Sequence, residues 1–130
     1  MSDFNETPSQ TAGPYVHIGC TPNFAGITGV YLEDLGQRMI TAGARGTLIT
    51  LTGIVYDGSG TPMRDAMVEA WQPDASGRFA GQDGADPAVS GFGRCPCDPV
   101  TGAYRFETVK PGAVPWPQGG KQAAHITLWI

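Results

Sequence analysis

The side chains of this sequence that most readily bind a metal are three cysteines and two histidines. Cys95 and Cys97 flank a single proline, a spacing that would supply half of the ligands of a structural zinc site. Such a site needs four ligands, and the only histidines are His17 and His125. We therefore expect Cys95 and Cys97 to be buried or free thiols. A zinc protein built on this pair is the alternative, and elemental analysis would distinguish the two.

His125 stands in an apolar segment, two residues before a hydroxyl side chain. If residues 124–130 form a strand, alternate residues share one face, and that face carries His125, Thr127 and Trp129. A lone imidazole beside a hydroxyl and an indole is more often a hydrogen-bonded packing residue than a metal ligand. We therefore predict that His125 is hydrogen-bonded and packed against its neighbours.

The elements that must position these residues are predicted to be strands. The chain has 130 residues, of which 41% are hydrophobic, and this is enough for one domain with a buried core. It also contains 19 glycines and 11 prolines, which favour short strands joined by turns over long helices. The composition therefore predicts an all-β fold.

Charge and hydropathy exclude two classes of partner. The net charge is -4 and the 8 basic residues are scattered, so no basic stripe is available to neutralise nucleic-acid phosphates. No run approaches the ~18 apolar residues of a membrane span, and residues 1–6 are acidic where a signal peptide would be basic. The odd number of cysteines gives no sign of an oxidising compartment. We expect a cytoplasmic protein that binds neither nucleic acid nor membranes.

Four segments have the composition of strands. Residues 47–56 are β-branched and apolar on both faces, which predicts a buried strand. A turn at residues 57–60 leads into a second strand at residues 66–72. Residues 103–109 alternate between apolar and charged side chains, a pattern typical of a half-buried antiparallel strand. Residues 124–130 form the fourth predicted strand.

The other segments are predicted to be irregular or loop-like. Residues 1–20 contain prolines and glycines that interrupt regular structure, so they form an arm, and residues 21–130 form the domain. Residues 30–35 are predicted to form one short helix. The glycine- and aspartate-rich loop at residues 81–93 is longer than usual, and long loops often serve a site. The three tryptophans are expected in the core.

The sequence ends inside its last apolar segment, residues 124–130, without a turn or a polar tail. A strand at that place leaves an open edge and exposed apolar side chains. We therefore expect the chain to be the N-terminal portion of a longer subunit.

A pattern of residues spread over positions 51–79 resembles a known family. It reads Leu-x-Gly-x-Val, a glycine-containing turn, an apolar strand ending in Val-Glu-x-Trp-Gln, and then Gly-Arg. The residues that fit are Leu51, Gly53, Val55, Gly60, Met63, Val68, Glu69, Trp71, Gln72, Gly77 and Arg78. Only Ala70 and Phe79 depart from it. The pattern is similar to that of the intradiol ring-cleavage dioxygenases, which implies an antiparallel β-sandwich, here truncated at its C-terminus.

The resemblance also implies where iron would bind, because this family holds ferric iron with two tyrosines and two histidines. The tyrosine positions fall on Phe79, in Gly-Arg-Phe, and on Val114, in Lys-Pro-Gly-Ala-Val-Pro-Trp. The histidine positions fall on His125, which is retained, and on Thr127. Ferric iron is a hard cation that favours anionic oxygen donors, and neither Phe79 nor Val114 has a lone pair. We therefore expect this chain to bind no metal, with Phe79, Val114 and Thr127 as vacant ligand positions.

The segment at residues 6–19 narrows the resemblance to the α subunits of heteromeric members of this family. The resemblance implies that a homologous β subunit carries the Fe(III) and that the α chain has no catalytic residue. It also implies that the α chain lends its arm to the site that the two subunits share, where a catechol and O2 would bind. The residues implied to line that substrate pocket are Thr11, Gly13, Pro14 and Tyr15. Pro14 and Gly13 would shape the backbone, and Thr11 and Tyr15 would offer hydroxyls.

Two alternatives remain open. The arm at residues 1–20 could clasp a neighbouring chain without touching a substrate. The whole chain could also be a β-sandwich binding or assembly module that has lost any part in dioxygenase function.

Overall fold

Most of the regular structure in this chain is β-strand. The computed structural model describes residues 7–9, 11, 13 and 15–130. Within these residues, the helix α1 (Tyr15–Cys20) precedes the strands. The strands in chain order are β1 (Leu48–Ile54), β2 (Met67–Trp71), β3 (Phe92–Pro96), β4 (Ala103–Val109), β5 (Val114–Pro115), β6 (Lys121–Gln122) and β7 (Thr127–Trp129).

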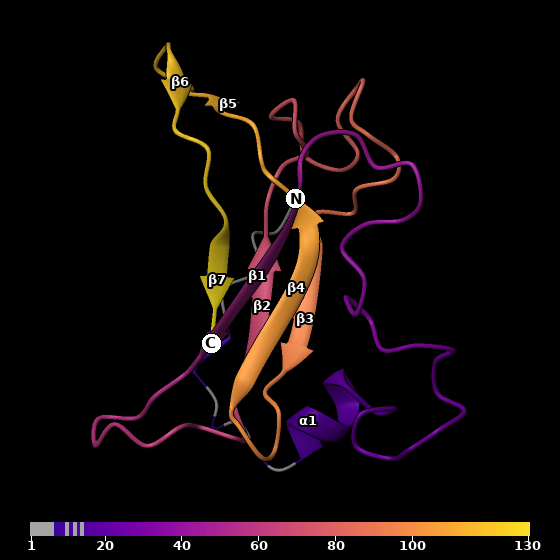
Figure 1. Ribbon diagram of the computed structural model, residues 1–130, viewed down its shortest axis with the longest axis vertical. Coiled ribbons are helices and arrows are strands. Elements are labelled where there is room, and N and C mark those ends of the chain that lie inside the picture. The colour runs from indigo at the N-terminus through magenta and orange to yellow at the C-terminus, as the bar shows by residue number, and fades with distance from the viewer. Residues whose placement is uncertain (1–6, 10, 12, 14) are drawn as a thin grey trace.

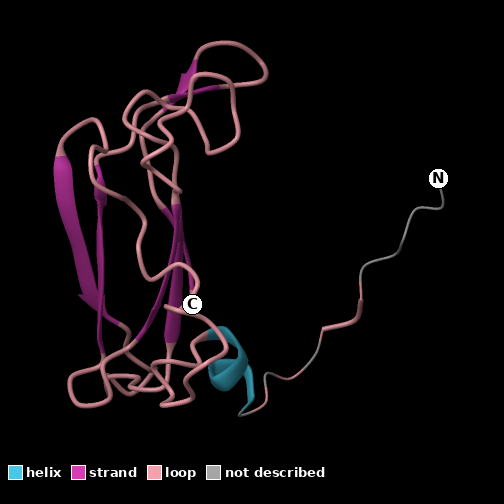
Figure 2. Ribbon diagram, turned by 90° about the vertical axis from the view of Figure 1, so that its right-hand side faces the viewer, coloured by secondary structure: helices cyan, strands magenta, loops and turns pink. Residues whose placement is uncertain are grey.

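The strands form two facing layers and a separate hairpin (Figure 1). β1 and β4 are antiparallel partners and make the first layer. In the second layer β2 lies between β3 and β7 and is antiparallel to both. β5 and β6 pair as a short hairpin away from the two layers. Viewed from the side, α1 lies beyond the second layer (Figure 2). The antiparallel β-sandwich predicted from the sequence is confirmed.

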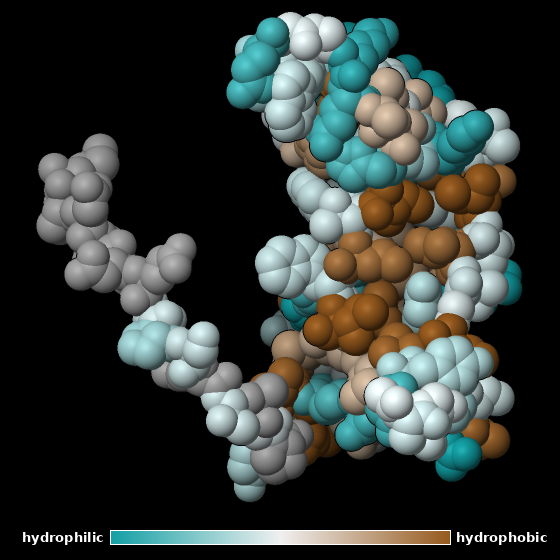
Figure 3. All heavy atoms as spheres, turned by 90° about the vertical axis from the view of Figure 1, so that its left-hand side faces the viewer, coloured by the Kyte–Doolittle hydropathy of each residue, from teal (hydrophilic) through white to brown (hydrophobic). Residues whose placement is uncertain are grey.

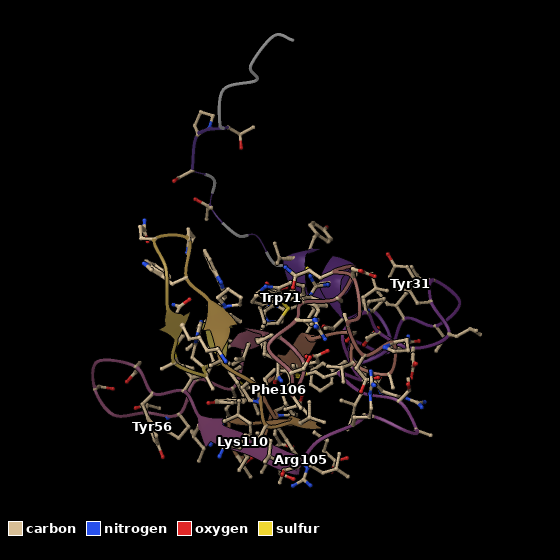
Figure 4. All side chains as sticks on the ribbon, turned by 90° about the horizontal axis from the view of Figure 1, so that it is seen from above. Tyr31, Tyr56, Trp71, Arg105, Phe106 and Lys110 are labelled. Carbon is tan, nitrogen blue, oxygen red and sulfur yellow. The ribbon has the colours of Figure 1, made fainter. Side chains whose placement is uncertain are left out.

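The core lies between the two layers. Phe106 of β4 is 4% exposed while its neighbour Arg105 is exposed, as the alternation in this strand predicted. Val68 and Ala70 of β2 face it from the other layer and are 0% and 1% exposed. Figure 4 shows the order across the sandwich, with Trp71 on the α1 side, Phe106 between the layers and Arg105 on the opposite side. Burial of a side chain such as Phe106 contributes about 1.5–3 kcal/mol to folding.

A buried glutamine joins the two layers at one end. Gln72, which follows β2 and is 0% exposed, donates hydrogen bonds from Nε2 to the carbonyl of Val109 at 2.9 Å and to that of Pro73 at 3.1 Å. The Thr108 hydroxyl donates to Gln72 Oε1 at 3.0 Å. All polar atoms of the Gln72 side chain therefore have partners, and the end of β2 is held against the end of β4 in the facing layer.

β1 differs from the buried strand that its sequence predicted. Leu48 is 66% exposed and Ile54 is 40% exposed, whereas Ile49 and Leu51 on the other face are half-buried. Among the described residues, no further strand layer covers the outer face of the sheet that β1 and β4 form. Although β1 carries apolar residues on both faces, only the face that points to the core is partly buried.

The prediction that the tryptophans lie in the core was wrong. Trp71 is 41% exposed, Trp116 is 47% exposed and Trp129 is 69% exposed. In β2 and β7 the positions that face the core are held by Ala70 and Leu128, which pair with each other. Because successive side chains of a strand point to opposite faces, Trp71 and Trp129 point outward.

The helix α1 lies inside the segment for which an irregular arm was predicted. The Val16 N–H donates to the Gly13 carbonyl at 3.1 Å at the start of the helix. At its end both the N–H and the hydroxyl of Thr21 donate to the His17 carbonyl, at 2.8 and 3.0 Å. Among the described residues of the predicted arm, regular structure therefore begins at residue 15.

The short helix predicted at residues 30–35 does not form. Gly29 and Gly36 flank the segment with positive φ angles of 88° and 79°. Asp34, which is 7% exposed, accepts hydrogen bonds from the N–H of Asn23 at 2.8 Å and from its side-chain amide at 3.1 Å. These contacts over a distance of 11 residues hold the segment as a loop, and they outweigh its weak helical preference.

Among the described residues, no helix has both the length and the apolar character that crossing a membrane requires.

Candidate functional site

Phe79, the first of the predicted vacant ligand positions, follows a turn that Asp74 organises. One carboxylate oxygen of Asp74 accepts hydrogen bonds from the N–H of Ser76 at 2.8 Å, from the Ser76 hydroxyl at 2.7 Å and from the N–H of Arg78 at 3.0 Å. The other oxygen accepts the N–H of Asp86 at 2.8 Å. Asp74 therefore fixes both the turn before Phe79 and the long loop that contains Asp86.

The carboxyl of Asp74 has a low pKa. Only 4% of Asp74 is exposed, and this burial raises its pKa. The hydrogen bonds from Ser76, Arg78 and Asp86 together outweigh burial and hold the pKa at about 2. The pKa of Asp86 is also lowered, first by the hydrogen bond from the Arg45 backbone. Both carboxylates are therefore charged at neutral pH and hold the loops around the site.

Phe79 uses its ring for packing. The ring stacks on Trp71, with the two centroids 5.5 Å apart and an angle of 13° between the planes. The Phe79 N–H donates to Gln82 Oε1 at 2.8 Å, which fixes the backbone at this point. Such aromatic pairs contribute about 0.5–1.5 kcal/mol beyond the burial of their area. The position where the family places a phenolate therefore holds a stacked apolar ring.

Val114, the second of the predicted vacant positions, is buried in β5 with 7% of the residue exposed. The segment before it lies directly against the turn before Phe79. Gly77 has a φ of 84°, and the Ala113 carbonyl occupies the place that a Cβ at residue 77 would need. This close backbone approach brings the segments that carry Phe79 and Val114 together.

Thr127 and His125 are the residues predicted at the two histidine positions. Thr127 lies opposite Trp71 in the register of β7 and β2, so the two side chains share the outer face of the sheet. The exposed His125 precedes β7, and its Nδ1 lies 2.8 Å from the carbonyl of Ala123, an arrangement in which the ring donates. His125 is hydrogen-bonded as predicted, but the prediction that it packs against neighbours was wrong.

The side chains at these four positions do not fit ferric iron. They offer an aromatic hydrocarbon ring, an aliphatic side chain, one neutral hydroxyl and one imidazole, and none of them can become an anionic oxygen donor at neutral pH. Across the described ranges, no cluster of three or more histidine, cysteine, aspartate or glutamate side chains is arranged to hold a metal ion. No chemical step at iron can therefore be assigned to the residues of this chain.

The cysteines are free thiols. Cys97 is 1% exposed, and Cys20 and Cys95 are half-buried. Burial raises the pKa of the Cys97 thiol, which keeps it protonated at neutral pH. Cys97 is buried and Cys95 is half-buried, and neither forms a disulfide, which agrees with the interpretation of this pair as buried or free thiols.

Around the vacant positions, aromatic side chains form an exposed surface on the second layer. Trp71 and Thr127 share the outer face of the sheet, and Trp129 lies two residues along β7 on the same face. Phe79 joins them through its stack on Trp71. We call these four residues, Trp71, Phe79, Thr127 and Trp129, the aromatic shelf.

An ion pair beside the aromatic shelf connects it to α1. Arg94 of β3 lies opposite Glu69 of β2, and its Nε and Nη2 lie 2.8 and 2.7 Å from Glu69 Oε1. Arg94 Nη1 also donates to the Cys20 carbonyl at the end of α1, at 3.3 Å. The sequence reasoning missed Arg94 because it placed no strand at β3. The only sequence signal for this ion pair was Glu69, which belongs to the family pattern.

The predicted pocket residues of the arm lie apart from these positions. Thr11 and Gly13 are exposed, and Tyr15, the first residue of α1, is 79% exposed. Pro14 lies outside the described residues. The structure brings Phe79 and Thr127 together around Trp71, and the described arm residues Thr11, Gly13 and Tyr15 line none of the three cavities found in the described part of the chain.

A cavity of about 530 Å³ lies elsewhere, at the edge of the sandwich near β3 and β4. It is lined in part by Arg94, Arg105 and Asp34. Their charges already have partners, because Arg94 pairs with Glu69, Arg105 pairs with Glu107, and Asp34 accepts backbone and amide hydrogen bonds. Asp98 also lines the cavity, where one of its carboxylate oxygens accepts hydrogen bonds from the N–H groups of Val100 and Thr101 at 2.9 and 2.7 Å.

The sequence matches the model of a family described as "Dioxygenase" over residues 21–129. Two relatives are protocatechuate 3,4-dioxygenase alpha chains. The one from Pseudomonas putida is 41% identical over 123 residues, 95% of this chain and 61% of the relative. The one from Burkholderia cepacia is 36% identical over 135 residues, 100% of this chain and 64% of the relative. This chain therefore spans less than two thirds of their length.

A beta chain and solved structures are also similar. The protocatechuate 3,4-dioxygenase beta chain of Burkholderia cepacia is 47% identical over 89 residues, 65% of this chain and 33% of that chain. An intradiol ring-cleavage dioxygenase from Tetranychus urticae has a TM-score of 0.57 at 25% identity, over 77% of this chain and 52% of that chain. A 3-chlorocatechol 1,2-dioxygenase from Rhodococcus opacus 1CP has a TM-score of 0.62 at 21% identity, over 78% of this chain and 46% of that chain. These structures share the β-sandwich described above.

Proposed function

This chain belongs to the dioxygenase family, and from that membership we propose that it is the non-catalytic α subunit of a heteromeric intradiol dioxygenase. The assembled enzyme would cleave protocatechuate with O2 and give 3-carboxy-cis,cis-muconate. The similarity to both alpha and beta chains of protocatechuate 3,4-dioxygenases supports a partnership with a homologous β subunit. We also place the enzyme in the cytoplasm, where free thiols such as Cys20, Cys95 and Cys97 are stable.

The observation that carries the proposal is the loss of the iron ligands within a preserved fold. The family pattern and the sandwich are present, yet Phe79, Val114 and Thr127 supply no anionic donor. A chain with this combination can serve catalysis only through another chain that has the complete ligand set. In this proposal the β subunit holds the Fe(III), and this chain contributes no catalytic residue.

We assign the contribution of this chain to its N-terminal arm, at the substrate pocket of the partner. The described arm residues Thr11 and Gly13 are exposed, as is Tyr15, so they are available to another chain. The hydroxyls of Thr11 and Tyr15 would bind and orient the substrate, and Gly13 and Pro14 would let the backbone approach a flat ring.

The division of labour is tested by expressing this chain alone and with a partner that has two tyrosines and two histidines at the ligand positions. Ferric tyrosinate absorbs visible light. The lone chain is expected to be colourless, free of iron by elemental analysis and inactive, whereas the complex is expected to be coloured and active. A lone chain that is coloured and cleaves protocatechuate would overturn the proposal.

The role of the arm is tested in the assembled complex with Thr11→Ala and Tyr15→Phe. Each change removes one hydroxyl, and loss of a hydrogen bond worth about 0.5–1.5 kcal/mol lowers kcat/KM for protocatechuate by roughly 2- to 12-fold. Tyr31→Phe is the matched control, because Tyr31 is exposed and lies outside the arm. If both arm variants match this control, the arm only clasps the partner, and a role in assembly is favoured.

A further inference from the structure

We propose that Cys95 and Cys97 are a redox-sensitive thiol pair, which a peroxide converts reversibly into a disulfide at the edge of the sandwich. This inference goes beyond the proposed function and does not depend on it. It gives a role to the Cys95-Pro96-Cys97 motif, which the proposed function leaves unexplained.

The two cysteines lie on the same face of one strand. Cys95 belongs to β3, and the Cys97 N–H donates to the Ala66 carbonyl at 2.8 Å, which continues the pairing of β3 with β2 by one residue. Because side chains alternate along a strand, residues two apart point the same way, and here both cysteines pack in or against the core. The proline between them fits this strand, because its nitrogen faces away from β2 and needs no N–H there.

The spacing of the pair is within reach of a disulfide. Residues two apart on a strand have Cα atoms about 6.4–6.8 Å apart, and disulfides span roughly 4.4–6.8 Å between Cα atoms. The strand therefore has to shorten slightly at Pro96 for the bond to form. β3 can adjust because, among the described residues, it pairs with β2 alone and is an edge strand (Figure 1).

The environments of the two thiols assign them different roles. Cys95 is half-buried and lines the cavity of about 530 Å³ near β3 and β4, where its Sγ accepts the N–H of Arg105 at 3.5 Å. Cys97 is 1% exposed. Burial first, and the charge of Cys95 second, raise the pKa of the Cys97 thiol, so Cys97 stays protonated. Cys95 is therefore the sulfur that a small oxidant reaches first, and Cys97 is the neighbour that completes the reaction.

The reaction with a peroxide such as hydrogen peroxide balances in two steps. The Cys95 sulfur attacks one oxygen, the O–O bond breaks, and Cys95 becomes a sulfenic acid while the other oxygen leaves as water. The Cys97 sulfur then attacks the Cys95 sulfur, the S–O bond breaks, and the disulfide forms with release of a second water. Both thiol protons end in the waters, and the pair has given two electrons to the peroxide.

The disulfide is expected to be labile. Cys97 belongs to the core cluster that contains Val68 and Phe106, and the bond draws its side chain toward Cys95 and away from that position. The bond closes only the loop from residue 95 to residue 97, and short loops gain the least stability from a disulfide. Strained disulfides are readily reduced, and those of cytosolic proteins are usually transient or redox-sensing. Reduction by a thiol therefore restores the pair.

The test treats this chain with hydrogen peroxide, alkylates the remaining thiols with iodoacetamide and maps the tryptic peptides by mass spectrometry. Trypsin cuts after Arg94 and Arg105, so both cysteines of the pair lie on the peptide of residues 95–105, and Cys20 lies on another. The expected product is the first peptide without alkyl groups and two hydrogen atoms lighter. Dithiothreitol before alkylation should restore both alkylated cysteines in this peptide.

Two variants separate the roles of the thiols. In Cys97→Ser the disulfide is expected to be lost, and Cys95 is expected to carry a sulfenic acid that dimedone traps. Cys20→Ser is the matched control, because Cys20 is also half-buried but lies at the end of α1. This control should change the yield of the disulfide less than about twofold.

Thermal unfolding compares the oxidised and the reduced chain. The oxidised chain should melt at a lower temperature, because the bond draws Cys97 out of its core position, and dithiothreitol should reverse the shift. A higher melting temperature would show a stabilising disulfide in place of a redox-sensitive pair.

Alkylation of both cysteines after a peroxide treatment that oxidises Cys20 would overturn the inference. So would a sulfinic acid at Cys95 beside a free Cys97 thiol, or a disulfide that joins two copies of the chain through Cys95. None of these outcomes concerns the iron or the arm, so the proposed function stands or fails separately.

Discussion

Asp74 holds the turn before Phe79 through four hydrogen bonds, all of which require the carboxylate as acceptor. The folded pKa of about 2 lies below the value of about 3.9 expected for an unfolded aspartate. The carboxylate therefore stabilises the fold fully above pH ~4, and this contribution is lost as the pH falls through the folded pKa. After allowance for solvent screening it amounts to about 1–2 kcal/mol.

We predict that Asp74→Asn lowers the free energy of unfolding at pH 7 by about 1–2 kcal/mol, measured by urea denaturation. The difference from wild type should shrink between pH ~4 and ~2, because the wild type loses its carboxylate there. Asp83→Asn, at an exposed position of the neighbouring loop, is the control. Equal stabilities of the two variants at pH 7 would contradict this account of the turn.

Gln72 offers a second test at the residue scale. Gln72→Leu keeps the size of the side chain but leaves the Thr108 hydroxyl and the Val109 carbonyl without their buried partner. We expect a loss of about 2–3 kcal/mol of unfolding free energy, whereas Gln122→Leu on the exposed strand β6 should cost less than about 0.5 kcal/mol.

The double variant Gln72→Leu, Thr108→Val separates the lost hydrogen bond from the change in packing. Removing both polar partners is less costly than orphaning one of them. The double variant should therefore be no less stable than Gln72→Leu alone. A strictly additive loss would show that the pair contributes nothing.

Among the elements, the sequence could predict the strands whose segments are either apolar and β-branched or alternate between apolar and charged residues. The strand at residues 103–109 was predicted with the bounds of β4, and those at 47–56 and 66–72 contain β1 and β2. β3 was missed because it begins at Phe92, inside a segment whose glycines and aspartates indicate a loop. β3 is extended because it pairs with β2, and not because of its own composition.

The sequence could predict which positions belong to the candidate site, but not how their side chains contact one another. The family pattern indicated Phe79, Val114 and Thr127, but not that Trp71 stacks on the first of them. Nor could the pattern indicate that Arg94 connects this face to α1, because that contact joins residues 74 positions apart in the sequence. Such contacts depend on the strand register, which a single sequence does not reveal.

The contact between Gly77 and Ala113 connects the turn after β2 to the segment that leads into β5. We predict that Gly77→Ala destabilises the fold by at least about 2 kcal/mol, because residue 77 has a positive φ and the space for a Cβ is taken by a backbone carbonyl. Gly58→Ala is the control, since a Cβ there meets nothing within 4 Å. Thermal unfolding followed by circular dichroism compares the two, and similar melting temperatures would refute the close approach.

At the scale of the whole molecule, apolar side chains gather on the side where β7 and β1 lie (Figure 3). Leu128 is 37% exposed and Ile130 is 75% exposed. Exposed apolar surfaces of this kind mark binding sites or cause association.

We predict that the lone chain binds the dye ANS and self-associates, and that the dye signal falls at least twofold when the β partner is added. Ile130→Ser should lower the dye signal of the lone chain because it interrupts the apolar surface. Leu32→Ser should leave the dye signal unchanged. Leu32 is 107% exposed, but it lies in a different loop region. Dye binding that is absent, or unchanged by the partner, would contradict the prediction.

The burial of Val114 also has an evolutionary consequence. A tyrosine at this position would have to enter a space that is now closed around a smaller side chain, and overpacking of that kind costs about 1–3 kcal/mol. Tyrosine at residue 79 or histidine at residue 127 alone would still leave iron with too few donors. Each single substitution toward the family's ligand set at these positions therefore adds at most one donor, so selection acting on one mutation at a time gains no iron site at any intermediate step.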